Sequence, residues 1–322
     1  MLSDPIDPSE ITAKGHHWVR TDDDRIVEYS VSGSQRPDAR VLVSGYFAGP
    51  PVPASWTQAY EALNIKVIEL SYPGLGLSSL HPGRKVIEWP KTDLEPVLEA
   101  EGVQDFWVYG VSYGTPHAMA VAQHFGPERV KAMALRVPYF GLPLSTELGL
   151  PDGQMRILTT DEVLRNTLKV KVYRRVSKTI GWVVLRVFSR PGKLMLMLMK
   201  SGMLGSMAKL MAGMKLDYPA EFECLSFAHA SLFPPGRDDT TLHMMASDVG
   251  LDLPGLDPRK IELSDDRVVV WYAADDADCP PSHGEWLAKH FRAKTRVLDG
   301  YGHFGGAYID QPQFIEELIG RP

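Results

Sequence analysis

Short apolar runs rich in valine, isoleucine and aromatic residues alternate with helical stretches along most of this sequence. Runs of this kind are typical of buried strands. The alternation predicts an α/β fold with a mostly parallel eight-stranded sheet and helices on both faces. No helix separates the first two strands, so we expect an antiparallel hairpin at that edge. The predicted strands span His16–Thr21, Ile26–Ser32, Arg40–Ser44, Lys66–Ser71, Asp105–Val111, Val130–Pro138, Arg267–Ala274 and Thr295–Asp299. The predicted helices span Ser55–Leu63, Val86–Ala100, Pro116–His124, Ser282–Phe291 and Pro312–Ile319.

One connection is much longer than a crossover between strands requires. No strand is predicted between Tyr139 and Asp266, and several helical patterns appear there. We expect residues 140–252 to form an inserted helical cap, or lid, domain. Residues 1–139 and 253–322 then form the core. The flanking sequences, Phe140–Pro143 and Leu253–Pro258, contain the glycine and proline that are frequent in hinges.

The segment Val163–Leu216, here called the basic Met-rich segment, contains no Asp or Glu, 12 Lys or Arg and seven of the 13 methionines. Because the whole chain has a net charge of −6, the rest of it carries −18. Three interpretations stay open. The segment packs the cap on the core, or it lines a pocket for an acyl chain or another hydrophobic small molecule. Alternatively, it makes weak peripheral contact with an anionic membrane.

Composition limits the classes of partner. A net charge of −6 over 322 residues does not suit a polyanion binder, and no nucleic-acid-binding module is present. Two cysteines, Cys224 and Cys279, form no disulfide framework. The first eight residues lack the features of a signal peptide, and no apolar run of membrane-spanning length occurs. We therefore expect a cytoplasmic protein without nucleic-acid partners, and a homodimer stays open. We find no P-loop or paired metal-binding motif and expect neither cofactor nor metal.

The sequence Gly110-Val111-Ser112-Tyr113-Gly114 follows a predicted strand and precedes a predicted helix. Two glycines around a serine permit a sharp strand-to-helix turn that exposes the serine hydroxyl. The helix that begins behind the turn favours developing negative charge. We therefore expect Ser112 to be a nucleophile. The alternative is an ordinary turn with a capping serine.

A serine nucleophile needs a base, and the base needs an acid to orient it. His303 comes just after the last predicted strand, and no other histidine in the core has such a position. Asp275, Asp276 and Asp278 compete for the role of acid after the preceding strand. We favour Asp276, which lies four residues before Pro280 at the start of the next predicted helix. The same acidic group could hold a cation, although its place at the end of this strand makes that interpretation poor.

The order Ser112, Asp276, His303, each at the end of a strand, resembles the α/β-hydrolase superfamily. Two further segments are similar to that family: Val41–Gly49 resembles its strand and oxyanion loop, and Ser71–Ser78 resembles its D-x-x-G-x-G-x-S turn. The resemblance covers about Gly15–Phe140 and Arg267–Ile319 and implies that the backbone N–H groups of Tyr46 and Tyr113 form the oxyanion hole. Ser44 and Ser71 depart from the pattern, because the family usually has His and Asp at these positions.

We therefore expect a serine hydrolase that cleaves an ester or related acyl bond of a hydrophobic small molecule through an acyl-enzyme. A serine nucleophile argues against the related haloalkane dehalogenases and epoxide hydrolases, which use a carboxylate. Hydrolysis of a carbon–carbon bond, an amide or a thioester would use the same residues. A ligand-binding receptor on a hydrolase fold with little or no turnover is the alternative from another class.

Overall fold

The computed structural model describes residues 6–45, 54–139, 144–151, 253 and 255–320. Its centre is an eight-stranded sheet with the order β1-β2-β4-β3-β5-β6-β7-β8. The strands are β1 (His17–Arg20), β2 (Ile26–Gly33), β3 (Arg40–Gly45), β4 (Ile65–Leu70), β5 (Phe106–Val111), β6 (Val130–Arg136), β7 (Val268–Ala273) and β8 (Lys294–Leu298). Every predicted strand is therefore present, with ends shifted by a few residues.

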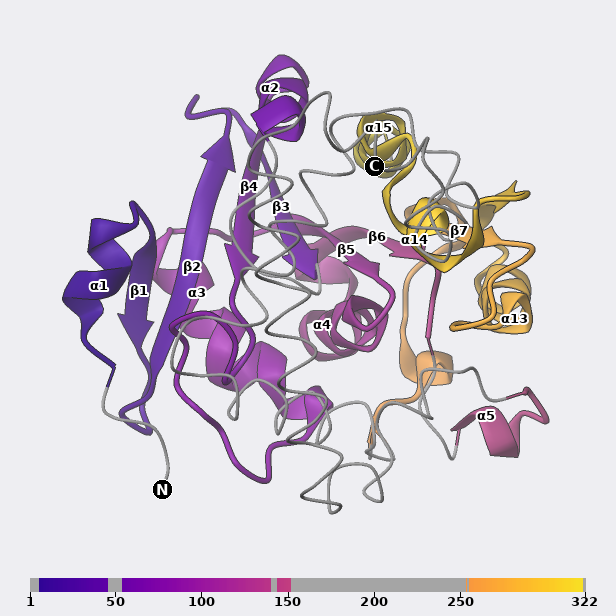
Figure 1. Cartoon of the computed structure of the whole chain (residues 1–322), viewed down its shortest axis with the longest axis horizontal. Helices are drawn as coiled ribbons and strands as arrows, with labels where there is room; N and C mark the ends of the chain where they lie inside the picture. The colour runs from indigo at the N-terminus through magenta and orange to yellow at the C-terminus, as the bar shows by residue number, and fades with distance from the viewer. Residues whose placement is uncertain (1–5, 46–53, 140–143, 152–252, 254, 321–322) are drawn as a thin grey trace, which may run out of the picture.

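The sheet is mixed rather than wholly parallel. β2 pairs with β1 and with β4 in antiparallel fashion, and the other neighbouring strands are parallel. The antiparallel hairpin predicted for the first two strands is confirmed. The parallel part brings the carboxyl ends of β3, β5, β6, β7 and β8 to the same edge of the sheet (Figure 1).

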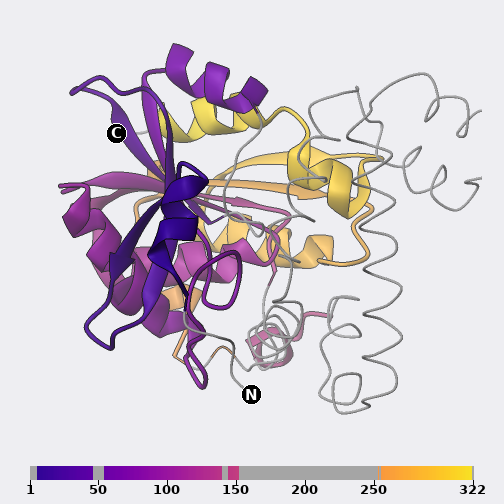
Figure 2. The same ribbon diagram turned by 60° about the vertical axis from the view of Figure 1, so that its left-hand side comes forward.

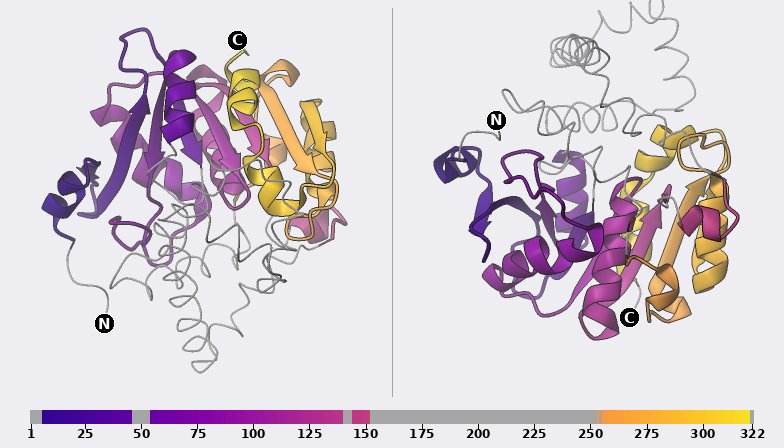
Figure 3. Two further views of the ribbon diagram at one scale, coloured as in Figure 1. Left: turned by 45° about the horizontal axis from the view of Figure 1, so that its top comes forward. Right: turned by 90° about the horizontal axis from the view of Figure 1, so that it is seen from below.

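Helices cover both faces of the sheet, as the alternation of elements predicts. On one face lie α3 (Glu95–Ala100), α4 (Gly114–Arg129) and α13 (Pro281–Phe291). On the other face α2 (Ala54–Ala62) and α15 (Gln311–Ile319) lie side by side (Figures 2 and 3). The short helix α1 (Pro8–Ala13) packs beside β1. No helix in the described ranges is long and apolar enough to cross a membrane.

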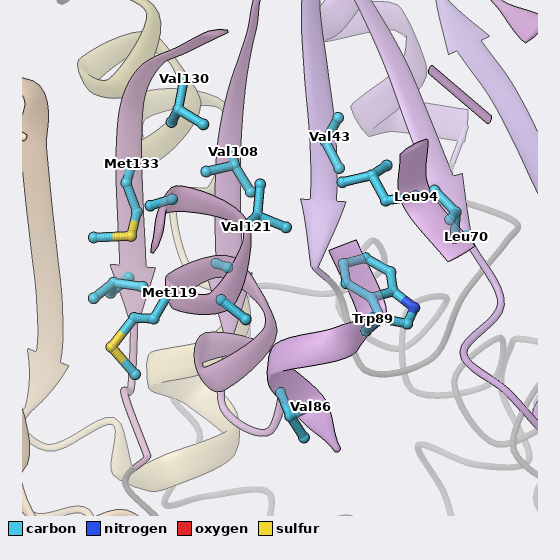
Figure 4. Packing of buried hydrophobic residues seen from close by; sticks show 14 of the residues in the cluster. Val43, Leu70, Val86, Trp89, Leu94, Val108, Met119, Val121, Val130 and Met133 are labelled. Atoms are coloured by element: carbon cyan, nitrogen blue, oxygen red, sulfur yellow. The ribbon is translucent and has the colours of Figure 1, made fainter. Parts of the chain in front are cut away.

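Successive residues of a strand face opposite sides of the sheet, so the strands contribute to two hydrophobic clusters, one on each face. Val108 of β5 and Met133 of β6 face α4, where they meet Met119 and Val121 (Figure 4). Their neighbours on the strands face the opposite way, toward α2 and α15. Burying an apolar side chain of this size stabilises the fold by about 1.5–3 kcal/mol. The core therefore holds the strand ends, and the loops that follow them, in fixed relative positions.

Two predicted segments differ from the structure. The helix expected over Val86–Ala100 consists of a 3₁₀ turn (Val86–Glu88), a π-helical turn (Pro90–Leu94) and α3, because two prolines interrupt it. The loop expected after β8 contains a short helix, α14 (Gly302–Tyr308). Three of its seven residues are glycine, so intrinsic helix propensity is low and contacts with the rest of the fold must stabilise this helix.

The predicted cap, residues 140–252, lies outside the described residues except for positions 144–151. That part contains α5 (Leu144–Glu147). The basic Met-rich segment and Cys224 fall entirely outside the described ranges. Two 3₁₀ turns, Pro258–Lys260 and Asp265–Arg267, lead from residue 255 back into β7.

Candidate active site

Ser112 lies in a tight turn between β5 and α4. Its φ of +53° is in the left-handed region, which side chains other than glycine rarely adopt. The Ser112 N–H donates to the Arg136 carbonyl at 2.9 Å, and the Ser112 carbonyl accepts the Thr115 N–H at 2.9 Å. These bonds hold the serine in its strained conformation. Strain of this kind is most frequent at functional sites.

The two glycines of the motif are required by the space around the turn. A Cβ atom at Gly110 would lie 2.4 Å from the Gly114 carbonyl oxygen, and one at Gly114 would lie 1.5 Å from the Gly45 carbonyl oxygen. Neither distance is compatible with a side chain. The turn therefore needs glycine at both positions, because backbone from β3 and α4 packs directly against it.

A continuous chain of hydrogen bonds links Ser112, His303 and Asp276. The Ser112 Oγ atom lies 2.8 Å from His303 Nε2. His303 Nδ1 lies 2.8 Å from Asp276 Oδ2. A carboxylate only accepts, so Nδ1 carries the ring proton and Nε2 is the acceptor that faces the serine hydroxyl. The side chains of His303 and Asp276 are only 9% and 1% exposed.

The three aspartates after β7 have different partners. Asp276 also accepts the N–H groups of Asp278 and Cys279 through Oδ1, at 2.9 and 2.8 Å. Asp275 instead accepts the N–H of Gly302, at 2.9 Å. The structure therefore brings Asp276 into contact with His303. Asp275 anchors Gly302, the residue that precedes this histidine.

Cys279 is a site residue that the sequence analysis missed. It is a free, buried cysteine, and its sulfur lies within 4.8 Å of ligand atoms of Asp276 and His303. Burial raises the pKa of its thiol, so the thiol is neutral at neutral pH. Nitrogen, oxygen and sulfur are donors that zinc accepts. Both oxygens of Asp276 and both ring nitrogens of His303 are already engaged in hydrogen bonds, however.

The surroundings of His303 raise the pKa of its imidazole. Burial by itself would lower the pKa of the imidazole, but the hydrogen bond to the Asp276 carboxylate and the negative charge of that carboxylate outweigh burial. The pKa of His303 therefore lies well above its ordinary value of 6.5. An imidazolium next to a carboxylate is the charge state that a general base reaches after it has taken a proton.

Of the two residues expected to form the oxyanion hole, the structure describes one. Tyr113 directly precedes α4, so its backbone lies at the positive end of that helix. Its ring packs edge-on against Tyr72, with ring centroids 5.8 Å apart. Tyr46 lies outside the described residues. Before it, the buried Ser44 hydroxyl donates to the Tyr109 hydroxyl at 3.0 Å.

The glycine-rich turn after β4 is supported by a carboxylate from another strand. Glu28 of β2 accepts the Ser71 hydroxyl at 2.8 Å and the Leu77 N–H at 2.7 Å. Its other oxygen pairs with His16 Nδ1 at 2.8 Å. Ser71 is the position where the family usually has Asp. Glu28 thus supplies a negative charge at the turn, and no motif local to residues 71–78 could have revealed it.

Aromatic rings pack behind Ser112. His117 of α4 stacks on Tyr72 at 4.0 Å between centroids and lies 5.3 Å from the Trp89 ring and 5.1 Å from the Tyr113 ring. Burial lowers the pKa of His117 well below its ordinary value, so this ring is neutral. His117 is therefore a packing residue and not a second base.

Comparison with known proteins agrees with this architecture. A sequence family described as the alpha/beta hydrolase fold matches residues 41–176. A search of curated proteins gives no significant match. Among solved structures, an esterase from Thermogutta terrifontis is similar at 17% identity and a TM-score of 0.56, over 95% of this chain and 98% of that one.

Two further solved structures show the same fold. An esterase from a Rhodococcus species has 17% identity and a TM-score of 0.59, over 95% of this chain and 97% of that one. An enol-lactonase from Burkholderia xenovorans has 13% identity and a TM-score of 0.55, over 95% of this chain and 100% of that one. The family match over residues 41–176 and these structural likenesses together show that the chain has the α/β-hydrolase fold.

Proposed function

We propose that the chain is a serine hydrolase that cleaves an ester or related acyl bond of a hydrophobic small molecule. The observation that carries this proposal is the hydrogen-bonded series from Ser112 Oγ through His303 to Asp276, with 2.8 Å at both junctions. This series has the atoms, order and distances that nucleophilic acyl transfer requires. The esterases and the enol-lactonase with similar folds are consistent with it.

In this proposal Ser112 Oγ attacks the carbonyl carbon of the substrate while His303 Nε2 accepts its proton. Asp276 holds the tautomer of His303 and stabilises the imidazolium. The backbone N–H groups of Tyr113 and Tyr46 donate to the oxyanion. His303 then returns the proton to the leaving group, which departs and leaves the acyl group on Ser112. A water molecule, deprotonated by His303, releases the acid.

We further propose that residues 140–252 form the cap over this site and that the methionines of the basic Met-rich segment contact the acyl group. Methionine side chains are flexible and apolar, so they suit substrates of varied shape. The core then comprises residues 1–139 and 253–322, and the protein acts in the cytoplasm. The dependence of rate on acyl length tests the apolar contact.

The experiment compares hydrolysis of p-nitrophenyl esters of increasing acyl length by the wild type and Ser112→Ala. We expect the wild type to turn over and Ser112→Ala to lose about 10⁶-fold in kcat. Ser264→Ala is the matched control, because that exposed hydroxyl donates to the Asp266 carboxylate and takes no part in the hydrogen-bonded series of Ser112, His303 and Asp276. It should retain full activity.

A fluorophosphonate probe gives a second readout that does not depend on the choice of ester. It should modify the wild type at Ser112, as peptide mass spectrometry identifies, and leave Ser112→Ala unmodified. Ester hydrolysis that survives in Ser112→Ala would contradict the proposed nucleophile. Labelling of Ser112 without turnover of any ester would move the search to thioesters, amides and carbon–carbon bonds.

A further inference from the structure

Arg136 is the last residue of β6, an inner strand of the sheet, and its side chain is completely buried. The guanidinium lies in the layer between the sheet and α15, with its carbon 5.4 Å from the Trp271 ring and 5.3 Å from the Phe314 ring. A permanently charged group is rarely buried in such surroundings, because leaving water is costly. Its hydrogen bonds must therefore be important for the local structure.

Three hydrogen-bond acceptors of the Arg136 guanidinium follow His303 closely in the sequence. Nε donates to the Gly306 carbonyl at 2.5 Å, Nη1 donates to Gln311 Oε1 at 2.9 Å, and Nη2 donates to the Ile309 carbonyl. Gly306 and Ile309 lie at the carboxyl end of α14, where carbonyl groups lack partners within the helix. A cation at this end also interacts favourably with the helix dipole.

The backbone of Arg136 holds the other half of the site. Its carbonyl accepts the Ser112 N–H at 2.9 Å, which fixes the serine in its positive-φ conformation. His303 is the second residue of the same short helix whose last turn the guanidinium binds. Arg136 therefore contacts both the turn that carries Ser112 and the helix that carries His303, from one rigid strand end.

The packing of α14 shows why this helix needs an external support. Its sequence contains three glycines and has low helix propensity. A Cβ atom at Gly306 would lie 2.8 Å from Val137 Cγ1 and 3.1 Å from Ala273 Cβ, so the helix rests closely on the ends of β6 and β7. At its start, Asp275 accepts the Gly302 N–H. The helix is thus held at both ends.

We propose that Arg136 is a positioning residue that sets the distance between Ser112 and His303 by binding both of their supporting segments. This inference rests on the proposed function, because the distance matters only if His303 deprotonates Ser112. A displacement of about 1 Å between reacting groups can reduce a rate by about 100-fold. Arg136 itself does not touch the reacting atoms, so substrate affinity should be little affected.

A second arginine, at the other end of the neighbouring strand, provides a matched control for Arg136. Arg267, at the start of β7, also donates to three backbone carbonyls, those of Pro127, Val130 and Lys131. It therefore stabilises neighbouring segments in the same manner but lies at the far end of β6 from Ser112. Arg267→Met removes comparable hydrogen bonds without touching the site.

The test measures kcat, KM and the rate of fluorophosphonate labelling for the wild type, Arg136→Met, Arg136→Lys and Arg267→Met. We expect kcat and labelling to fall by about 100-fold in Arg136→Met with KM nearly unchanged. Arg136→Lys keeps the buried charge but cannot reach all three acceptors, so it should be intermediate. This second variant covers the case in which Arg136→Met does not fold. Arg267→Met should retain the kcat and the labelling rate of the wild type.

The inference is overturned if Arg136→Lys and any folded Arg136→Met react as fast as Arg267→Met. A wild type that neither hydrolyses esters nor labels at Ser112 is a failure of the proposed function instead. In that case an NMR measurement of the His303 Nδ1 proton, which the hydrogen bond to Asp276 should deshield, still tests the positioning role. The signal of this proton should weaken or disappear in Arg136→Lys and persist in Arg267→Met, and an unchanged signal in both would refute the role.

Discussion

Replacing Glu69 with glutamine should make the protein more stable at neutral pH. Glu69 lies on β4, between Ser30 of β2 and Ser44 of β3, and its side chain is 1% exposed. Burial raises the pKa of its carboxyl group from 4.5 to about 8, and the nearby Ser44 hydroxyl offsets only part of that effect. At pH 7 the folded protein therefore carries a protonated Glu69, whereas the unfolded chain carries an ionised one.

The sign and size of the effect follow from this difference. When folding raises the pKa of an acid, the unfolded state loses its proton first, so the free energy of unfolding falls as pH rises from 4.5 to about 8. The ordinary pKa of 4.5 and a pH of 7 differ by about 2.5 pH units. At about 1.4 kcal/mol per unit, the free energy of unfolding is therefore lower by about 3 kcal/mol at pH 7. Glutamine has the shape of the protonated acid and cannot ionise, so Glu69→Gln avoids this loss.

Urea denaturation at several pH values tests the reasoning. Glu69→Gln should exceed the wild type by about 3 kcal/mol in unfolding free energy at pH 7, and the difference should vanish near pH 4.5. Glu28→Gln is the control of opposite sign: although burial opposes it, hydrogen bonds from His16, Leu77 N–H and Ser71 lower the pKa of Glu28. That variant should be destabilised at pH 7. An advantage of Glu69→Gln that is independent of pH would refute the argument.

Three further outcomes are expected. Asp276→Asn should fold but lose about 10⁴-fold in kcat, measured by steady-state ester hydrolysis, because the amide favours the wrong tautomer of His303. The rising limb of kcat/KM against pH should lie above 6.5, since the pKa of His303 is raised and only the neutral ring accepts a proton; a midpoint below 6.5 would contradict this. Gly76→Ala should lower the unfolding free energy by about 3 kcal/mol or more, because its Cβ would lie 2.2 Å from Glu28 Oε2. Gly83→Ala, also at positive φ but with no atom within 4 Å of its Cβ, should lose only about 1–2 kcal/mol in the same urea experiment.

The elements of the core could be predicted because their signals are local. Eight apolar runs correspond to eight strands. The six inner strands are mostly buried, and a strand buried on both faces needs apolar residues at successive positions, whereas the edge strands β1 and β8 are largely exposed. The sharp turn at Ser112 is equally predictable from the local sequence. Gly110 and Gly114 are the positions where a side chain would collide with backbone, so a short stretch of sequence specifies the geometry.

The choice among Asp275, Asp276 and Asp278 illustrates what local patterns leave open. The three residues have the same chemistry within four positions, and spacing only favoured Asp276. In the structure, Asp276 meets His303, while Asp275 binds the Gly302 N–H. The direction of each side chain depends on the turn after β7 and on where α14 lies, and neither is encoded within the aspartate segment itself.

The sequence by itself determined the strands, the helices between them and the exposed serine, because these depend on patterns within about ten residues. The tertiary structure decided the helix of His303, the role of Glu28 beside Ser71, and the burial of Arg136 between Ser112 and α14. These features join residues between 24 and 175 positions apart in the chain. A charged side chain can replace a local motif or support a weak helix from such a distance, because packing, and not sequence proximity, brings its partners within reach of a hydrogen bond.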